Sequence, residues 1–76
     1  MTGLPVVSAK DAIKAFMKIG YQVVRQRGSH IRLHHSFDKR KTPLTVPSHR
    51  TLGKGLLHKL LRDADLTIDE FIRLLK

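Results

Sequence analysis

The stretch that decides the fold is YQVVRQRGSHIRLHH, residues 21–35. Residues 21–26 are rich in side chains that favour strands. Gly28-Ser29 then fits a two-residue type II′ hairpin turn, which requires Gly at its first central position. From residue 30 to residue 35 polar and apolar side chains alternate, as in a strand with one buried face. The apolar side chains of this second strand are Ile31 and Leu33, and the polar ones opposite them are His30, Arg32 and His34.

A third strand follows the hairpin after a polar loop over residues 37–41. Residues 42–46 again alternate, with Leu44 and Val46 expected to face inward. Pro43 cannot donate to a strand ladder, so this strand is expected to lie at an edge or to begin there. Consecutive strands joined by short loops form an antiparallel sheet.

An amphipathic helix precedes the strands. Ser8 is its expected N-cap, Asp11 completes a capping box, and Gly20 is expected to end it. The apolar side chains recur at helical spacing, while Lys10, Lys14 and Lys18 lie opposite. The expected inner face consists of Ala9, Ala12, Ile13, Phe16 and Met17.

Two more helices are expected after a loop over residues 47–52. The first covers residues 53–63, and Thr67 with Glu70 forms a full capping box for the second. Their expected inner faces consist of Leu56, Leu57, Leu60, Leu61 and Ala64 in the first, and of Ile68, Phe71, Ile72 and Leu75 in the second.

These elements predict a single α+β domain over residues 1–76, in the order α-β-β-β-α-α. The helices are expected to cover one face of the three-stranded antiparallel sheet, because each element must bury its apolar side. The other face stays open to solvent. It is expected to carry His30, Arg32 and Thr45.

The charge of the chain indicates a polyanion partner. Fifteen Lys and Arg oppose six Asp and Glu, which gives a net charge of +9. Such an excess is typical of nucleic-acid binding. A membrane surface is disfavoured as a partner, because the helices need their apolar faces for the core. The chain has no Cys, and we find no signal peptide or membrane span, so the expected location is the cytoplasm.

His30 is the candidate catalytic residue, because it stands directly after a tight turn on the open face. The 2′-hydroxyl of RNA can attack its own phosphate if a base removes the proton, which suits an imidazole and needs no metal. Arg32, about 7 Å along the strand, can neutralise that phosphate. Arg25, Arg27 and Ser29 are further phosphate-binding candidates. The sequence spacing alone is explained at least as well if His30 is a surface residue with no catalytic role.

Three other histidines are weaker candidates for a role in catalysis. His34 lies about 13 Å along the strand from His30, so it contacts RNA or is simply exposed. His35 is expected to point toward the helix side or the end of the strand, where it is a core residue or has no role. His49, in a loop, is an alternative to His34 or water as the donor of the leaving-group proton, or has no role. Asp38 is the only acid near them, so neither a metal site nor a cofactor is expected.

A basic stripe is expected on the helix over residues 53–63. Lys54, His58 and Arg62 follow each other at i, i+4 and i+8, with no acid before Asp63. This pattern suits phosphates across an RNA groove, although a solvated polar face remains the alternative. The aromatic residues are expected to be structural, which disfavours base stacking. They are Phe16, Tyr21, Phe37 and Phe71.

Several segments together resemble the HicA toxin family. They are Gly20-Tyr21, the run from Arg25 to His30, Val46-Pro47-Ser48-His49, the Leu56-Leu57 helix, and the run from Thr67 to Phe71. The Gly-Ser-His segment after Arg-Gln is the most specific of them. The family consists of small ribonucleases with a double-stranded-RNA-binding-domain-like fold.

The resemblance implies that His30 is catalytic, that the substrate is messenger RNA, and that a HicB-type antitoxin inhibits the protein. One departure is Asp65, which stands where the family usually has Gly, and Asp tolerates the left-handed conformation better than most residues. The competing interpretation is a non-catalytic double-stranded-RNA-binding module that uses only the basic stripe. His30 in its Gly-Ser-His setting favours the enzyme.

Overall fold

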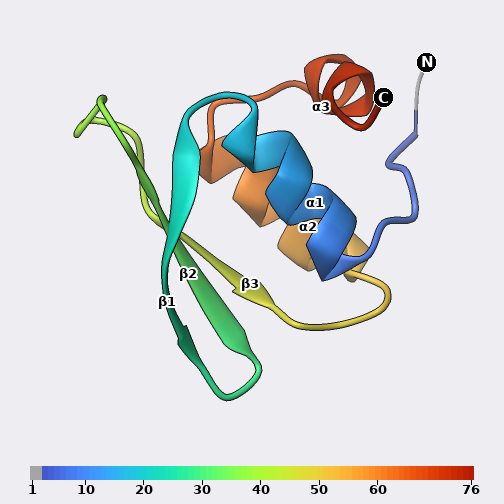
Figure 1. The fold of residues 1–76 in the computed structure, drawn as a ribbon. Coiled ribbons are helices and arrows are strands. Elements are labelled where there is room, and N and C mark those ends of the chain that lie inside the picture. The colour runs from blue at the N-terminus through green and yellow to red at the C-terminus, as the bar shows by residue number, and fades with distance from the viewer. Residues whose placement is uncertain (1–2) are drawn as a thin grey trace.

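The computed structural model describes residues 3–76, and its elements follow the predicted order (Figure 1). The predicted α+β class is confirmed. The elements are α1 (Ala9–Met17), β1 (Tyr21–Arg27), β2 (His30–His35), β3 (Leu44–Pro47), α2 (Lys54–Asp63) and α3 (Ile68–Leu74).

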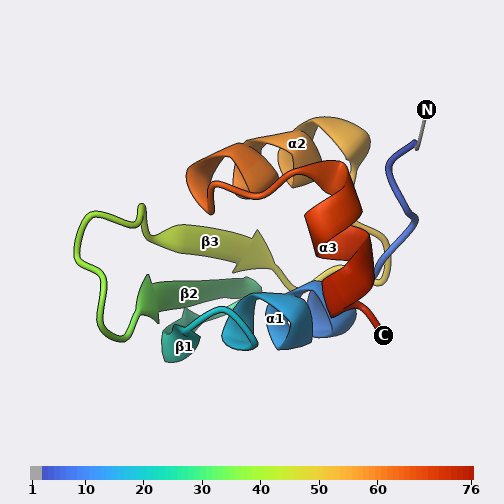
Figure 2. The same cartoon turned by 90° about the horizontal axis from the view of Figure 1, so that it is seen from above.

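The three strands form an antiparallel sheet in the order β1-β2-β3, so β2 is central. Helix α1 packs against β1 and β3, α2 packs against β3, and α3 packs against α1. Figures 1 and 2 show the layer of helices beside the sheet. Leu33, Leu44 and Val46 are fully buried under these helices, as their alternation predicts. The sheet therefore has one covered and one open face.

Aromatic rings join the helices to the sheet in the core. The ring of Phe16 on α1 lies 5.6 Å from that of Phe71 on α3 and 6.2 Å from that of Tyr21 on β1. All three side chains are almost inaccessible to solvent. The Tyr21 hydroxyl donates to the carbonyl of Thr42 at 2.8 Å, so its polar end is satisfied. Burial raises the pKa of Tyr21, with Asp63 and Asp38 adding smaller effects.

The predicted helix boundaries rest on hydrogen bonds that the structure contains. The Ser8 hydroxyl accepts from the backbone N–H of Asp11 at 3.1 Å. Thr67 and Glu70 form the reciprocal capping box at 2.9 and 3.1 Å, which lowers the pKa of Glu70. Asp65 has φ 59°, so it adopts the left-handed conformation expected of it.

Three expectations about apolar side chains are wrong. Met17 is 51% exposed, because the last turn of α1 directs Ala15 and Phe16 into the core instead. Phe37 is 79% exposed, although its ring packs on His35 at 4.5 Å. Ile72 is only partly buried and lies outside the core, which Leu74 contacts in its place.

The third strand begins two residues later than expected. It covers Leu44–Pro47 rather than residues 42–46, and Pro43 lies just before it. This is consistent with proline lacking the N–H that a ladder uses. The strand lies at the edge of the sheet, as Pro43 predicts.

Gly20 gives a stability prediction, because its φ is +107° and a Cβ there would lie 2.6 Å from Nε2 of His35. His35 cannot easily move, because its ring nitrogens bond to the Ile19 carbonyl and the Asp38 N–H. We expect Gly20→Ala to lower the free energy of unfolding by roughly 1–3 kcal/mol in urea titrations. Gly55→Ala is the control, because a Cβ meets nothing within 4 Å there. If Gly20→Ala loses no more stability than Gly55→Ala, the predicted clash at Gly20 does not exist.

Candidate active site

The β1–β2 hairpin holds His30 at a fixed position. Gly28 has φ +58° and Ser29 is not in the positive-φ region, as the predicted type II′ turn requires. His30 is the first residue of β2, and it pairs with Arg27 on one side and Pro47 on the other. The carbonyl of Ser29 also accepts from the N–H of Ser48 at 2.6 Å. The exposed imidazole therefore projects from backbone that is anchored on both sides.

The two-residue turn and a β-bulge together set the faces of the β1 side chains. The turn places Arg27 opposite His30 and Arg25 opposite Arg32, so both arginines share the open face with their partners. Val23 pairs with Leu33, so Val24 is an additional residue between the pairs of Val23 and Arg25. This bulge shifts the register of the residues before it, so that Tyr21 lies opposite His35.

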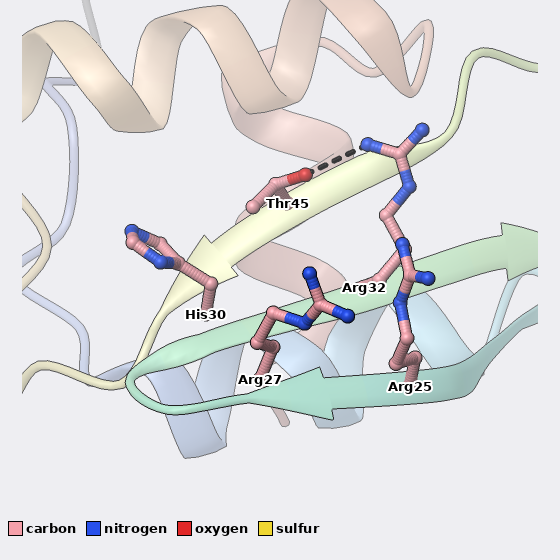
Figure 3. A pocket seen from close by; sticks show the side chains of 5 residues that line it. All are labelled: Arg25, Arg27, His30, Arg32 and Thr45. Atoms are coloured by element: carbon pink, nitrogen blue, oxygen red, sulfur yellow. Dashed lines mark hydrogen bonds between the residues drawn. The ribbon is translucent and has the colours of Figure 1, made fainter.

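Five side chains line one open hollow on this face (Figure 3). They are Arg25, Arg27, His30, Arg32 and Thr45. The structure thus brings together His30 and three of the predicted phosphate-binding arginines. Ser29, a further candidate, is in the turn and does not line the hollow. Thr45 was expected on this face but not at the site.

The arginines are not equivalent with respect to His30. Arg27 is its direct cross-strand partner, whereas Arg32 pairs with Arg25 on one side and Thr45 on the other. The Nη1 of Arg32 donates to the Thr45 hydroxyl at 2.8 Å. Figure 3 shows the Arg32 guanidinium directed to Thr45 and away from the imidazole. Arg27 is therefore better placed than Arg32 to share a phosphate with His30.

The hollow carries uncompensated positive charge. Within residues 3–76 the ion pairs are Arg40–Asp38 at 3.2 Å, Lys41–Asp65 at 3.8 Å and Lys59–Asp63 at 3.0 Å, all outside it. Hydrogen bonds from Arg40 also lower the pKa of Asp38, so they stabilise the Asp38 carboxylate at its position outside the hollow. Among residues 3–76 no carboxylate pairs with the three arginines of the hollow, and guanidinium groups in general bind carboxylates and phosphates.

The other histidines do not join His30. His35 has a structural role, the first of its two expected alternatives: its Nδ1 accepts from the Asp38 N–H at 3.0 Å, and its Nε2 lies 2.6 Å from the Ile19 carbonyl. Its ring also packs on Tyr21 at 5.1 Å. His34 and His49 are exposed and do not line the hollow. Residues 3–76 contain no group of three potential metal ligands placed to bind one ion.

The predicted basic stripe is exposed on α2. Lys54, His58 and Arg62 all face solvent, while the neighbouring Lys59 is paired with Asp63. None of the three stripe residues lines the hollow around His30. Arg62 lines a different hollow, whose other lining residues are Asp38, Arg40, Lys41, Thr42, Asp63 and Asp65. The stripe and the His30 hollow are thus two separate basic regions.

Comparison with models of known protein families identifies the family of this chain. A model of the HicA toxin of bacterial toxin–antitoxin systems matches residues 9–66. The match begins with α1, includes the His30 hairpin and the whole sheet, and ends after α2. The chain therefore belongs to the HicA toxin family, and it is the toxin component of a toxin–antitoxin pair. No curated protein matches it significantly. Among the described residues no helix is long and apolar enough to cross a membrane.

Proposed function

We propose that this toxin is a metal-independent endoribonuclease that cleaves messenger RNA, with His30 as the base acting on the 2′-hydroxyl. One observation carries the proposal. His30 shares an open hollow with three arginines that have no carboxylate partner among residues 3–76. A neutral imidazole accepts a proton at physiological pH, and guanidinium groups bind the phosphate that the proton transfer activates.

The proposed reaction uses no metal and no cofactor. His30 takes the proton of the 2′-hydroxyl, whose oxygen attacks the adjacent phosphorus while the bond from phosphorus to the 5′-oxygen breaks. Arg27, opposite His30, stabilises the charge added to the phosphate oxygens. The 5′-oxygen takes a proton from water, because His34 and His49 both lie outside the hollow. The hydroxide that remains takes up the proton held by His30, which restores the neutral imidazole. The products are a 2′,3′-cyclic phosphate and a 5′-hydroxyl.

The test of this function is cleavage of RNA by the purified protein in excess chelator, beside a His30→Ala variant. Cleavage by the first and not by the second supports the proposal. RNA that is bound but left intact by the purified, folded toxin would favour a binding module instead.

The antitoxin is proposed to be a HicB-type protein that covers the open face of the sheet. An active ribonuclease must be inhibited in the cell that produces it, and a partner that covers His30 prevents RNA from reaching it. A net charge of +9 favours an acidic partner, because complementary charge accelerates association. RNA and antitoxin would then compete for the same surface.

The second candidate function is a non-catalytic double-stranded-RNA-binding module, and the exposed stripe on α2 favours it. We expect Lys54→Glu and Arg62→Glu each to weaken RNA binding and to lower the slope of log Kd against log salt by roughly one. Lys10→Glu, the same charge change on the exposed side of α1, is the matched control. Filter binding over a range of salt concentrations measures all three. Equal losses in all three variants would mean that the stripe has no specific role.

A further inference from the structure

The three arginines and His30 of the hollow form two cross-strand pairs on the open face. Arg27 and His30 form the first pair, next to the turn, and Arg25 and Arg32 form the second. Each pair is two residues from the other along its strand, which is about 7 Å. The mechanism proposed above uses the first pair and leaves the second without a role.

The second pair is electrostatically unfavourable by itself. Like charges directly opposite each other destabilise a sheet, and Arg32 is partly buried, which reduces screening by water. Within residues 3–76 the only hydrogen-bond partner of these two guanidinium groups is the Thr45 hydroxyl, which accepts from Arg32 at 2.8 Å but carries no charge. The two guanidinium groups are therefore arranged to receive an anion.

We propose that Arg25 and Arg32 form a second phosphate subsite, which binds the RNA phosphate next to the one that is cleaved. This inference rests on the proposed function, since it takes the Arg27–His30 pair as the site of cleavage. Two phosphates one nucleotide apart on a single strand match two side-chain pairs spaced along β1 and β2. Thr45 keeps the two subsites separate, because its hydrogen bond directs Arg32 away from His30 (Figure 3).

Small ligands that cannot be cleaved test the subsite independently of catalysis. A 2′-O-methylated dinucleoside monophosphate has one phosphate, and a further phosphate can be added at its 5′ or its 3′ end. We expect one of the two phosphorylated forms to bind about tenfold more tightly than the parent, because it gains charge-assisted hydrogen bonds to both guanidinium groups. Titrations followed by NMR chemical shifts of the hairpin amides and the His30 ring give the dissociation constants.

Two variants with the same change of charge distinguish the subsite from general attraction. Arg25→Gln is expected to remove the gain from the added phosphate, and Arg73→Gln, on α3, to keep it. Arg25→Lys retains the charge without the bidentate geometry, so it should keep only part of the gain. The fold should tolerate these changes, because Arg25 is exposed and its removal relieves a like-charge pair.

The outcomes are separate from those of the cleavage assay. If neither added phosphate tightens binding, or if Arg25→Gln and Arg73→Gln lose the gain equally, the subsite is refuted whether or not the toxin cleaves RNA. If the gain appears and depends on Arg25 in a protein that cleaves no RNA, the subsite stands and the proposed reaction fails.

Discussion

Replacing His30 by alanine is expected to lower RNA cleavage by about 10²- to 10⁴-fold, the contribution that a general base typically makes. The fold should remain intact, because the side chain is exposed and makes no hydrogen bond within the described structure. Such surface substitutions usually change stability by within about 0.5 kcal/mol. RNA affinity should also persist, since the arginines that supply the positive charge remain.

The matched control for this variant is His34→Ala. His34 lies on the same strand and the same face as His30, is also exposed, and does not line the hollow. Initial rates on one RNA, with circular dichroism of each protein, make the comparison. If the folded His30→Ala protein cleaves as fast as the wild type, or if His34→Ala loses as much activity, the assignment of the base is wrong.

A substrate with a single 2′-deoxy sugar at the cut site should resist cleavage at that bond, because the proposed nucleophile has been removed. Neighbouring ribonucleotide bonds in the same molecule provide the internal control. Excess chelator should leave the rate unchanged, since no step uses a metal. Gel analysis of an end-labelled RNA with and without the deoxy sugar measures both effects. Equal cleavage of the deoxy substrate would mean that water or a metal hydroxide is the nucleophile.

The fold was predictable because its signals are local. The Gly28-Ser29 turn, the alternation in β2 and the capping box of Thr67 with Glu70 each depend on residues that are close in sequence. The solvent exposure of side chains at the ends of helices was not predictable from such local signals. Met17 has helical spacing, yet it lies in the last turn of α1, where packing against α3 and β1 decides which side chains are covered.

The site was predictable in part. The position of His30 and Arg32 on one face follows from the alternation in β2, which the structure confirms. The positions of Arg27 opposite His30 and of Arg25 opposite Arg32 follow from the two-residue turn, whereas nothing in the alternation of β1 indicates the bulge at Val24. The contact from Arg32 to Thr45 joins residues 13 positions apart, so it depends on the register between β2 and β3. Strand register of this kind is a tertiary property.

If the 2′-hydroxyl of RNA is the nucleophile and His30 is its base, the chemical ends of the RNA fragments must show it, because they record which oxygen attacked the phosphorus. Mass spectrometry of a short RNA after cleavage by the purified toxin in excess chelator gives the masses of both fragments. We expect a 2′,3′-cyclic phosphate on the upstream fragment and a 5′-hydroxyl on the downstream one, and neither product with His30→Ala. A 3′-hydroxyl upstream with a 5′-phosphate downstream would mean that the 2′-hydroxyl is not the nucleophile.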